Sequence, residues 1–186
     1  MNILNRLLEK SKNTKELLSF TKYGDETFWF GYVIEYSEEY VAIQHFTKYG
    51  KNDGIIIHLL SGFQRIDYDD DYSKAMIPVI DYSDEIHKSN KIALNFDESE
   101  NFHLNILRQF LDEKNIIISI QINNDEYSTG YIKEISEVDF TMNCVGKMGE
   151  DFGLSILKID DITNIQIDDI DNRKRNLLYK WRKTSL

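Results

Sequence analysis

Cysteine and proline are nearly absent from this chain of 186 residues. Cys144 is the single cysteine, so no disulfide can form within the chain, and nothing in its composition calls for an oxidising compartment. No stretch approaches the ~20 apolar residues that span a membrane, and the N-terminal residues lack the apolar run and cleavage site of a signal peptide. We therefore expect a cytoplasmic protein with no membrane-embedded part.

Motifs for catalysis and for metal binding are missing as well. The four histidines lack the spacing of metal ligands, and no glycine-rich loop suited to phosphate is present. The acidic segment from Asp67 to Asp71 lacks the calcium-loop pattern, and we expect Asp69-Asp70, like Asp168-Asp169, to cap helices instead. The sequence therefore predicts a protein that is not an enzyme and that holds neither a metal nor a cofactor.

Acidic residues outnumber basic ones, 32 to 22, which gives a net charge of −10. Six of the basic residues fall within residues 171–186, so the rest of the chain is more acidic still. An acidic body repels phosphate, which disfavours nucleic acid as the main ligand and favours a basic protein partner. Hydrophobic residues make up 41 % of the chain, which is enough for a folded core.

The chain does contain an internal repeat. A shift of 99 residues without gaps aligns residues 31–70 with 130–169 and gives 12 identities in 40 positions, where average composition gives about three. Matching pairs include Gly31 with Gly130, Asp70 with Asp169 and, more conservatively, Leu17 with Ile116. We interpret residues 2–80 and 101–179 as two copies of one small, mostly-β unit.

Each copy shows the same succession of expected elements, in which a short helix (2–12, 101–113) precedes five strands. A Lys-x-Gly-x-x-x-Gly connection separates the third strand from the fourth. The expected strands are 16–23, 27–36, 40–46, 55–60 and one ending at 68, then 116–122, 127–135, 139–145, 154–159 and one ending at 167. A closing helix follows each copy, and Pro78 fits the end of the first. Residues 81–100 read as an acidic linker between domains 1–80 and 101–186.

This succession resembles the small β-barrels of the Sm-like and SH3-like type, and it is similar to uncharacterised bacterial proteins with a shared glycine, aromatic and hydrophobic pattern. The resemblance implies a mainly β (α+β) fold of two tandem five-stranded barrels, each preceded by a short helix, plus a C-terminal helix. Many Sm-like proteins bind RNA. The turns before the fifth strands, Ser61-Gly62 and Asp160-Asp161, lack the cation of that RNA site, so we do not expect RNA there.

The C-terminal helix carries the remaining basic residues. Leu177, Leu178 and Trp181 share one face, which we expect to pack on the second barrel while the cations face solvent. The alternatives are contact with nucleic acid or with an acidic surface, such as the body of a second copy of this chain. The candidate nucleic-acid contacts are Arg173, Lys174, Arg175, Lys180 and Arg182.

Aromatic residues concentrate in the first copy, and several are polar at the matching position of the second. Ser128 replaces Trp29, for example, and Asp139 replaces Tyr40. Such positions are not obligatory core sites, and tryptophan and tyrosine dominate binding hot spots. The candidate partner-binding residues are Trp29, Phe30, Tyr40 and Tyr49. In the alternative interpretation, Trp29 and Phe30 pack between the barrels or beneath the N-terminal helix.

Together these patterns predict a cytoplasmic, non-enzymatic protein-interaction module. Its partner is expected to be a protein of basic charge or a second copy of the same chain. One concrete form is an immunity-type inhibitor of a basic toxin, which rests on charge alone. The alternative is an Sm-like protein that binds nucleic acid through its basic C-terminal helix.

Overall fold

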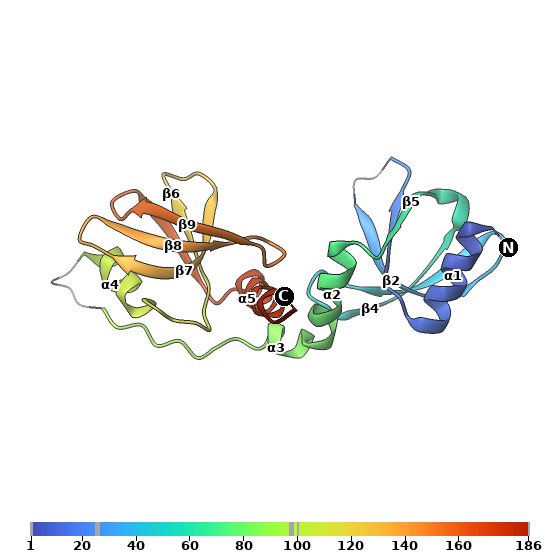
Figure 1. Cartoon of the computed structure of the whole chain (residues 1–186), viewed down its shortest axis with the longest axis horizontal. Coiled ribbons are helices and arrows are strands. Elements are labelled where there is room, and N and C mark those ends of the chain that lie inside the picture. Colours follow the sequence, from blue (N-terminus) through green and yellow to red (C-terminus); the bar gives the residue numbers. More distant parts are fainter. Residues whose placement is uncertain (1, 25–26, 97–98, 100, 186) are drawn as a thin grey trace. The chain divides into compact units, whose positions relative to one another are not determined.

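The chain forms two compact units, Met1–Ser83 and Asp84–Leu186. The computed structural model describes residues 2–24, 27–96, 99 and 101–185. Each unit contains one five-stranded antiparallel sheet with short helices, so the fold is α+β and mostly β (Figure 1). None of the helices among the described residues is long and apolar enough to cross a membrane.

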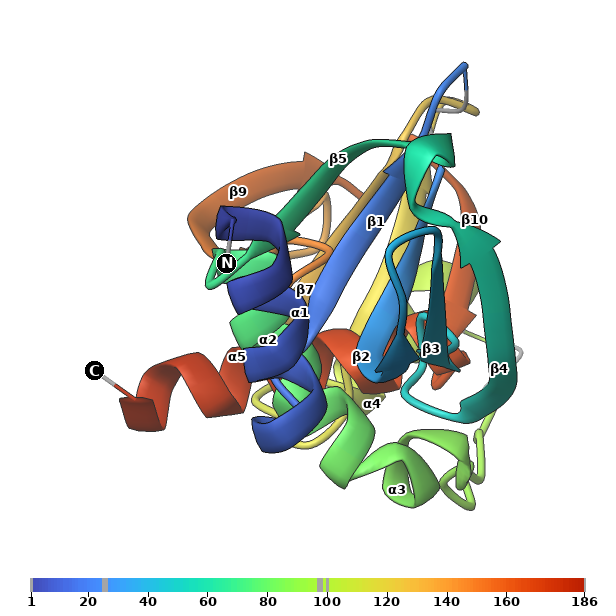
Figure 2. The same ribbon diagram turned by 90° about the vertical axis from the view of Figure 1, so that its right-hand side faces the viewer.

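The first unit begins with one helix, ends with another, and contains a single sheet. Its elements are α1 (Ile3–Thr14), β1 (Leu18–Lys22), β2 (Phe28–Tyr36), β3 (Tyr40–Phe46), β4 (Asn52–Leu59), the 3-10 turn η1 (Leu60–Gly62), β5 (Phe63–Tyr68) and α2 (Asp71–Asp81). The strand order is β4-β3-β2-β1-β5, so β4 and β5 are the edges of a strongly twisted sheet (Figure 2). Helix α1 packs on β2.

The second unit repeats this order of strands and closing helix. Its elements are α3 (Ser83–His87, which begins at the boundary), α4 (Phe102–Gln109), β6 (Ile118–Ile122), β7 (Tyr127–Ile135), β8 (Asp139–Val145), β9 (Asp151–Lys158), β10 (Ile162–Ile167) and α5 (Ile170–Ser185). The strand order β10-β6-β7-β8-β9 makes β9 and β10 the edges. Among the described residues the two edges of each sheet do not pair with each other, so the sheets are open and the expected closed barrels are not seen.

The two sheets share their strand registers. Gly31 lies opposite His45, and Gly130 lies opposite Cys144, which keeps the offset of 99. A Cβ atom on Gly31 would stand 1.8 Å from the Gln44 carbonyl oxygen, so the close approach of β2 and β3 requires glycine there. The same contact recurs at Gly130.

The offset changes to 100 in the first strand of each sheet. Leu18 pairs with Gly31, whereas Ile118 pairs with Gly130, because the β1–β2 connection is one residue longer than the β6–β7 connection. The counterpart of Leu17 is therefore Ile117, and the expected pairing with Ile116 is wrong by one residue.

One face of each sheet covers a hydrophobic core, because alternate residues of a strand point to the same side. The first core contains Leu8, Leu18, Phe20, Val33, Val41, Ile43 and Phe63. The second contains Leu104, Ile106, Leu107, Phe110, Ile118, Ile120, Ile132, Phe140, Met142, Ile159 and Ile162. The N-terminal helices α1 and α4 thus contribute side chains to the core of their own unit.

Each closing helix packs against the turn between the third and fourth strands. Gly50 (φ 80°) and Gly149 (φ 79°) adopt left-handed conformations in these turns. A Cβ atom on Gly50 would stand 2.1 Å from the Val79 carbonyl oxygen of α2, and one on Gly149 would stand 2.5 Å from the Leu178 carbonyl carbon of α5. Asp70 accepts a hydrogen bond from Ser73 N, and Asp169 accepts one from Asn172 N, so the predicted capping is confirmed for the second aspartate of each pair.

Three expectations about helices and the linker differ from the structure. Pro78 was expected at the end of the first closing helix, but it lies inside α2, which continues to Asp81. Proline has no backbone N–H to donate within the helix, and the Pro78 ring is buried. Part of the expected linker 81–100 belongs to the second unit: Ile86 is buried, and Asn90 N donates to Asp168 Oδ2 over 2.7 Å. Residues 97, 98 and 100 of that segment lie outside the described residues. Helix α4 ends at 109, four residues earlier than expected.

Candidate functional site

The two aromatic candidates on β2 face opposite sides of the sheet. Trp29 points to the core side, where its ring lies 5.1 Å from His58 and 6.0 Å from Phe63. Phe30 is only 3 % exposed and packs beneath α2, with its ring 5.2 Å from that of Tyr72. Successive residues of a strand alternate in direction, so these two side chains do not form one surface, and Phe30 is inaccessible to a partner.

The other two candidates are separate from this pair. Tyr40 is 47 % exposed at the start of β3, opposite Leu59 of the edge strand. Tyr49 is half-buried in the turn after β3, with Lys48 Nζ 4.7 Å from its ring centre. The structure therefore does not assemble the four predicted residues into a single site.

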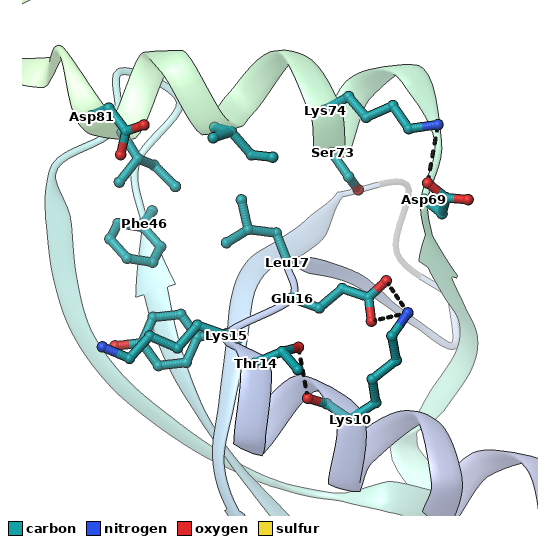
Figure 3. A pocket seen from close by; sticks show the side chains of 13 residues that line it. Lys10, Thr14, Lys15, Glu16, Leu17, Phe46, Asp69, Ser73, Lys74 and Asp81 are labelled. Carbon is teal, nitrogen blue, oxygen red and sulfur yellow. Dashed lines mark hydrogen bonds and ion pairs between the residues drawn. The ribbon is translucent and has the colours of Figure 1, made fainter.

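The first unit instead has an open cleft of about 580 Å³ that the sequence did not reveal. It lies between the end of α1, the α1–β1 connection and α2 (Figure 3). The apolar side chains that line it are Leu17, Tyr32, Phe46, Ile77 and Ile80. Leu17 and Ile80 come from opposite ends of the unit, and only the fold brings them together.

Paired charges surround this apolar lining. Lys10 and Glu16 form an ion pair of 2.8 Å, and Lys74 pairs with Asp69 over 3.0 Å (Figure 3). The hydrogen bond to Glu16 raises the pKa of Lys10, and the hydrogen bond from Lys74 lowers the pKa of Asp69. Both shifts favour the charged form, of Lys10 in one pair and of Asp69 in the other. Lys15 has a left-handed backbone (φ 58°), and its Nζ lies 5.7 Å from the Tyr32 ring centre.

The apolar end of the matching place in the second unit is filled, whereas Asn115, Arg173 and Asn176 at its other end line a separate pocket of about 380 Å³. Ile117, Tyr131 and Val145 are buried at the apolar end, and Tyr179 packs against them. These residues correspond in order to Leu17, Tyr32, Phe46 and Ile80 of the open cleft. The rings of Tyr131 and Tyr179 lie 5.4 Å apart, and burial raises the pKa of Tyr131. The second unit thus fills with its own Tyr179 ring the space that the shorter Ile80 leaves open.

Polar groups hold the Tyr179 hydroxyl in the second unit. It accepts a hydrogen bond from Asn143 Nδ2 and donates one to Asp151 Oδ2, both over 3.3 Å. The matching residues of the first unit are Gln44 and Asn52, whose side chains are joined by a 2.7 Å hydrogen bond. The first unit therefore retains amide groups where a phenol hydroxyl sits in the second.

The cations of α5 bind groups of their own unit. Arg173 Nε donates to the Ile86 carbonyl (2.6 Å), Arg175 Nη1 to the Val145 carbonyl (3.2 Å), Arg182 Nε to the Met148 carbonyl (2.8 Å), and Lys180 Nζ to Asn115 Oδ1 (2.9 Å). Lys174 is only 7 % exposed. Leu178 is fully buried, as its predicted packing requires, while Leu177 and Trp181 are half-buried. Four of the five predicted nucleic-acid contacts thus bond to groups of their own unit, and Lys180 among them remains exposed.

No cluster suited to a metal occurs in the part of the chain that the structure describes. His58 packs its ring 4.9 Å from Phe63, and His45 Nδ1 lies 3.3 Å from Asp53. Cys144 is half-buried on β8, and its thiol points to the Met142 carbonyl over 3.8 Å. These side chains have structural partners and do not converge.

A second feature that sequence reasoning missed is a row of exposed apolar side chains on one edge strand of each sheet. On β4 the row is Ile55, Ile57 and Leu59, and on β9 it is Phe152, Leu154 and Ile156. Ile57 is 70 % exposed and Ile156 is 74 % exposed. The alternation of Leu154, Ser155 and Ile156 predicts a strand with one apolar face. The sequence does not show whether that face packs on the core or is exposed to solvent.

Comparisons with protein-family models, with curated proteins and with solved structures found no match.

Proposed function

We propose that this chain is a non-enzymatic protein-interaction module whose first unit binds a side chain of a protein partner in the cleft between α1 and α2. One observation carries the proposal: four apolar positions that line the open cleft of the first unit are packed together in the second unit, where Tyr179 fills the space. Concave apolar sites with a few polar groups at the edge are the usual form of a binding site.

The second unit also indicates which side chain fits. Tyr179 fills the matching space with a phenol ring and places its hydroxyl between an amide and a carboxylate. In the first unit the matching residues, Gln44 and Asn52, hydrogen-bond to each other and do not line the cleft. A partner that presents a tyrosine would bury its ring on Leu17 and Ile80. Aromatic anchors of this kind are common hot spots.

The charge of the chain favours a basic partner. A net charge of −10 attracts positively charged surfaces over distance and raises the rate of encounter. An immunity-type inhibitor of a basic toxin is one concrete form of this proposal, in the cytoplasm, where a chain with a single cysteine needs no oxidising conditions. The contacts of α5 with its own unit leave nucleic acid without a specific supporting observation.

We further infer that the two units descend from one duplicated segment and that each is a small barrel of Sm-like or SH3-like type. The shared register offsets and the shared glycine contacts support the duplication. The strand order, with a short turn between the fourth and fifth strands, supports the barrel type. In this interpretation the second copy provides a closed version of the site that stays open in the first.

The test uses N-acetyl-tyrosinamide as a probe and methyl NMR of the full chain. We expect millimolar binding that shifts the methyl signals of Leu17, Ile77 and Ile80, on the order of what one buried ring provides. Ile80→Tyr should fill the cleft from within and abolish these shifts, whereas N-acetyl-valinamide should not bind. The Tyr179→Ile variant is the matched control, because it should open a second site. Absence of shifts at about 10 mM probe, where a millimolar site is mostly filled, would refute the proposal.

A further inference from the structure

The edge strands β4 and β9 expose apolar side chains in a place that soluble proteins usually protect. Exposed sheet edges normally carry lysine, proline or a covering element, because their unpaired N–H and C=O groups invite another strand. Here Ile55 and Ile57 of β4, and Leu154 and Ile156 of β9, are each at least 60 % exposed. β4 pairs only with β3, and β9 pairs only with β8, among the described strands. Such apolar edges mark interaction surfaces.

We propose that a second copy of this chain covers these edges, with β4 of one copy pairing antiparallel with β9 of the other. In the register that we assign, Ile57 lies opposite Leu154, and Ile55 lies opposite Ile156. The remaining apolar residues, Leu59 and Phe152, then come together at one end. This surface is distinct from the cleft, so the inference goes beyond the proposed function.

Charge distinguishes this pairing from the two alternatives. At the other end of the assigned register, Asp53 of β4 comes beside Lys158 of β9, and both residues are exposed. Antiparallel pairing of two β4 strands, with Ile55 opposite Ile57, would instead place Asp53 beside Leu59. Pairing of two β9 strands, with Leu154 opposite Ile156, would place Lys158 beside Phe152. Only the pairing of β4 with β9 joins unlike charges and keeps apolar residues together.

The apolar area that the β4–β9 contact would bury is large enough for self-association when each copy uses both of its edge strands. Six apolar side chains, at on the order of 100 Å² each, give about 600 Å² for one β4–β9 contact. A copy that pairs through both of its edges buries about 1,200 Å² in two contacts, which reaches the size of stable interfaces. Main-chain hydrogen bonds along both edges would add specificity of register. We therefore expect self-association with a dissociation constant in the micromolar range.

The experiment is sedimentation equilibrium of the purified full chain, compared with five variants. We expect the wild type to associate, and we expect Ile57→Lys to raise the dissociation constant on the order of a hundredfold, because the lysine would be buried. Ile3→Lys, at an apolar residue that is 72 % exposed on α1, is the matched control and should have no effect.

A charge swap tests the register itself. Asp53→Lys or Lys158→Asp alone should each weaken association about three- to tenfold, because like charges then meet at the end of the strands. The double variant should recover most of the loss. A wild type that stays monomeric at about 100 µM, a hundredfold above a micromolar dissociation constant, would refute the inference. Association that Ile57→Lys leaves unchanged, or a double variant that shows no recovery, would also refute it. None of these results bears on the probe binding that tests the cleft.

Discussion

Replacing two equivalent serines with alanine should change stability in opposite directions. Ser19 on β1 pairs with Phe30, and Ser119 on β6 pairs with Thr129, in the same register. The hydroxyl of Ser119 lies 2.9 Å from Thr129 Oγ1 and 2.8 Å from Asn172 Oδ1. The hydroxyl of Ser19 is equally buried but has no hydrogen-bond partner among the described residues.

The expected magnitudes follow from these contacts. Ser119→Ala removes two buried hydrogen bonds and leaves two polar atoms without their partner, which should lower the free energy of unfolding of the second unit by about 1–2 kcal/mol. Ser19→Ala removes a buried hydroxyl whose desolvation nothing offsets, which should raise the free energy of unfolding of the first unit by about 1 kcal/mol. The backbone and the substitution are matched, so the difference in sign isolates the hydrogen bonds.

Each unit contains one of the two tryptophans, which makes the assay specific. Trp29 reports on the first unit and Trp181 on the second when the other is replaced by phenylalanine. Urea unfolding of Ser19→Ala and Ser119→Ala in the matching single-tryptophan background gives the two free energies. A loss of stability in Ser19→Ala would show that the hydroxyl has a partner, such as an ordered water, and would refute the reasoning.

Two further predictions concern the turns and pH. Gly50→Ala and Gly149→Ala should each destabilise their unit by about 2–4 kcal/mol, because φ is positive and a helix backbone lies within 2.5 Å of the added Cβ atom; Gly54→Ala, with positive φ but open space, should cost only about 1 kcal/mol in the same urea assay. The hydrogen bond from Lys183 lowers the pKa of Asp151, so its small stabilising effect is present above the ordinary value of 3.8 and is lost as pH falls through the lowered pKa. The wild type should therefore lose slightly more stability between pH 4 and 2 than Lys183→Ala, because the pair is exposed; equal acid profiles would contradict this.

The repeat explains why the strand boundaries could be predicted from the sequence, although the face of the sheet to which each side chain points could not. Two copies provide two independent patterns for each strand, and the expected ranges 127–135 and 139–145 match β7 and β8 at both ends. The sequence does not fix the side on which a run of aromatic residues points. Trp29 and Phe30 are both large and aromatic, so their sequence does not show which of them faces the core. Only the pairing of β2 within the sheet places Phe30 on the face that α2 covers.

The cleft and the exposed edges depend on contacts between distant parts of the chain. Leu17 and Ile80 meet only when α2 packs back on the sheet, and no local pattern signals that meeting. The exposure of Ile57 depends on β4 being an edge strand, which is a property of strand order. The matched shift of 99 residues nevertheless contained one usable signal: Ile80 aligns with Tyr179, a loss of an aromatic ring at an otherwise apolar site.

Three differences between the units lie where the closing helix meets the sheet. Phe30 replaces Thr129, Ser73 replaces Asn172, and Ile80 replaces Tyr179, and all three changes alter contacts between helix and sheet. In the second unit these contacts include hydrogen bonds from Ser119 and a packed Tyr179 ring, whereas in the first they leave buried hydroxyls and an open cleft. A copy that only had to be stable would gain from the sealed arrangement, at about 1 kcal/mol for each satisfied hydroxyl. The first unit gives up this stability at the one junction that opens into its cleft, which is the pattern expected of a site kept for binding.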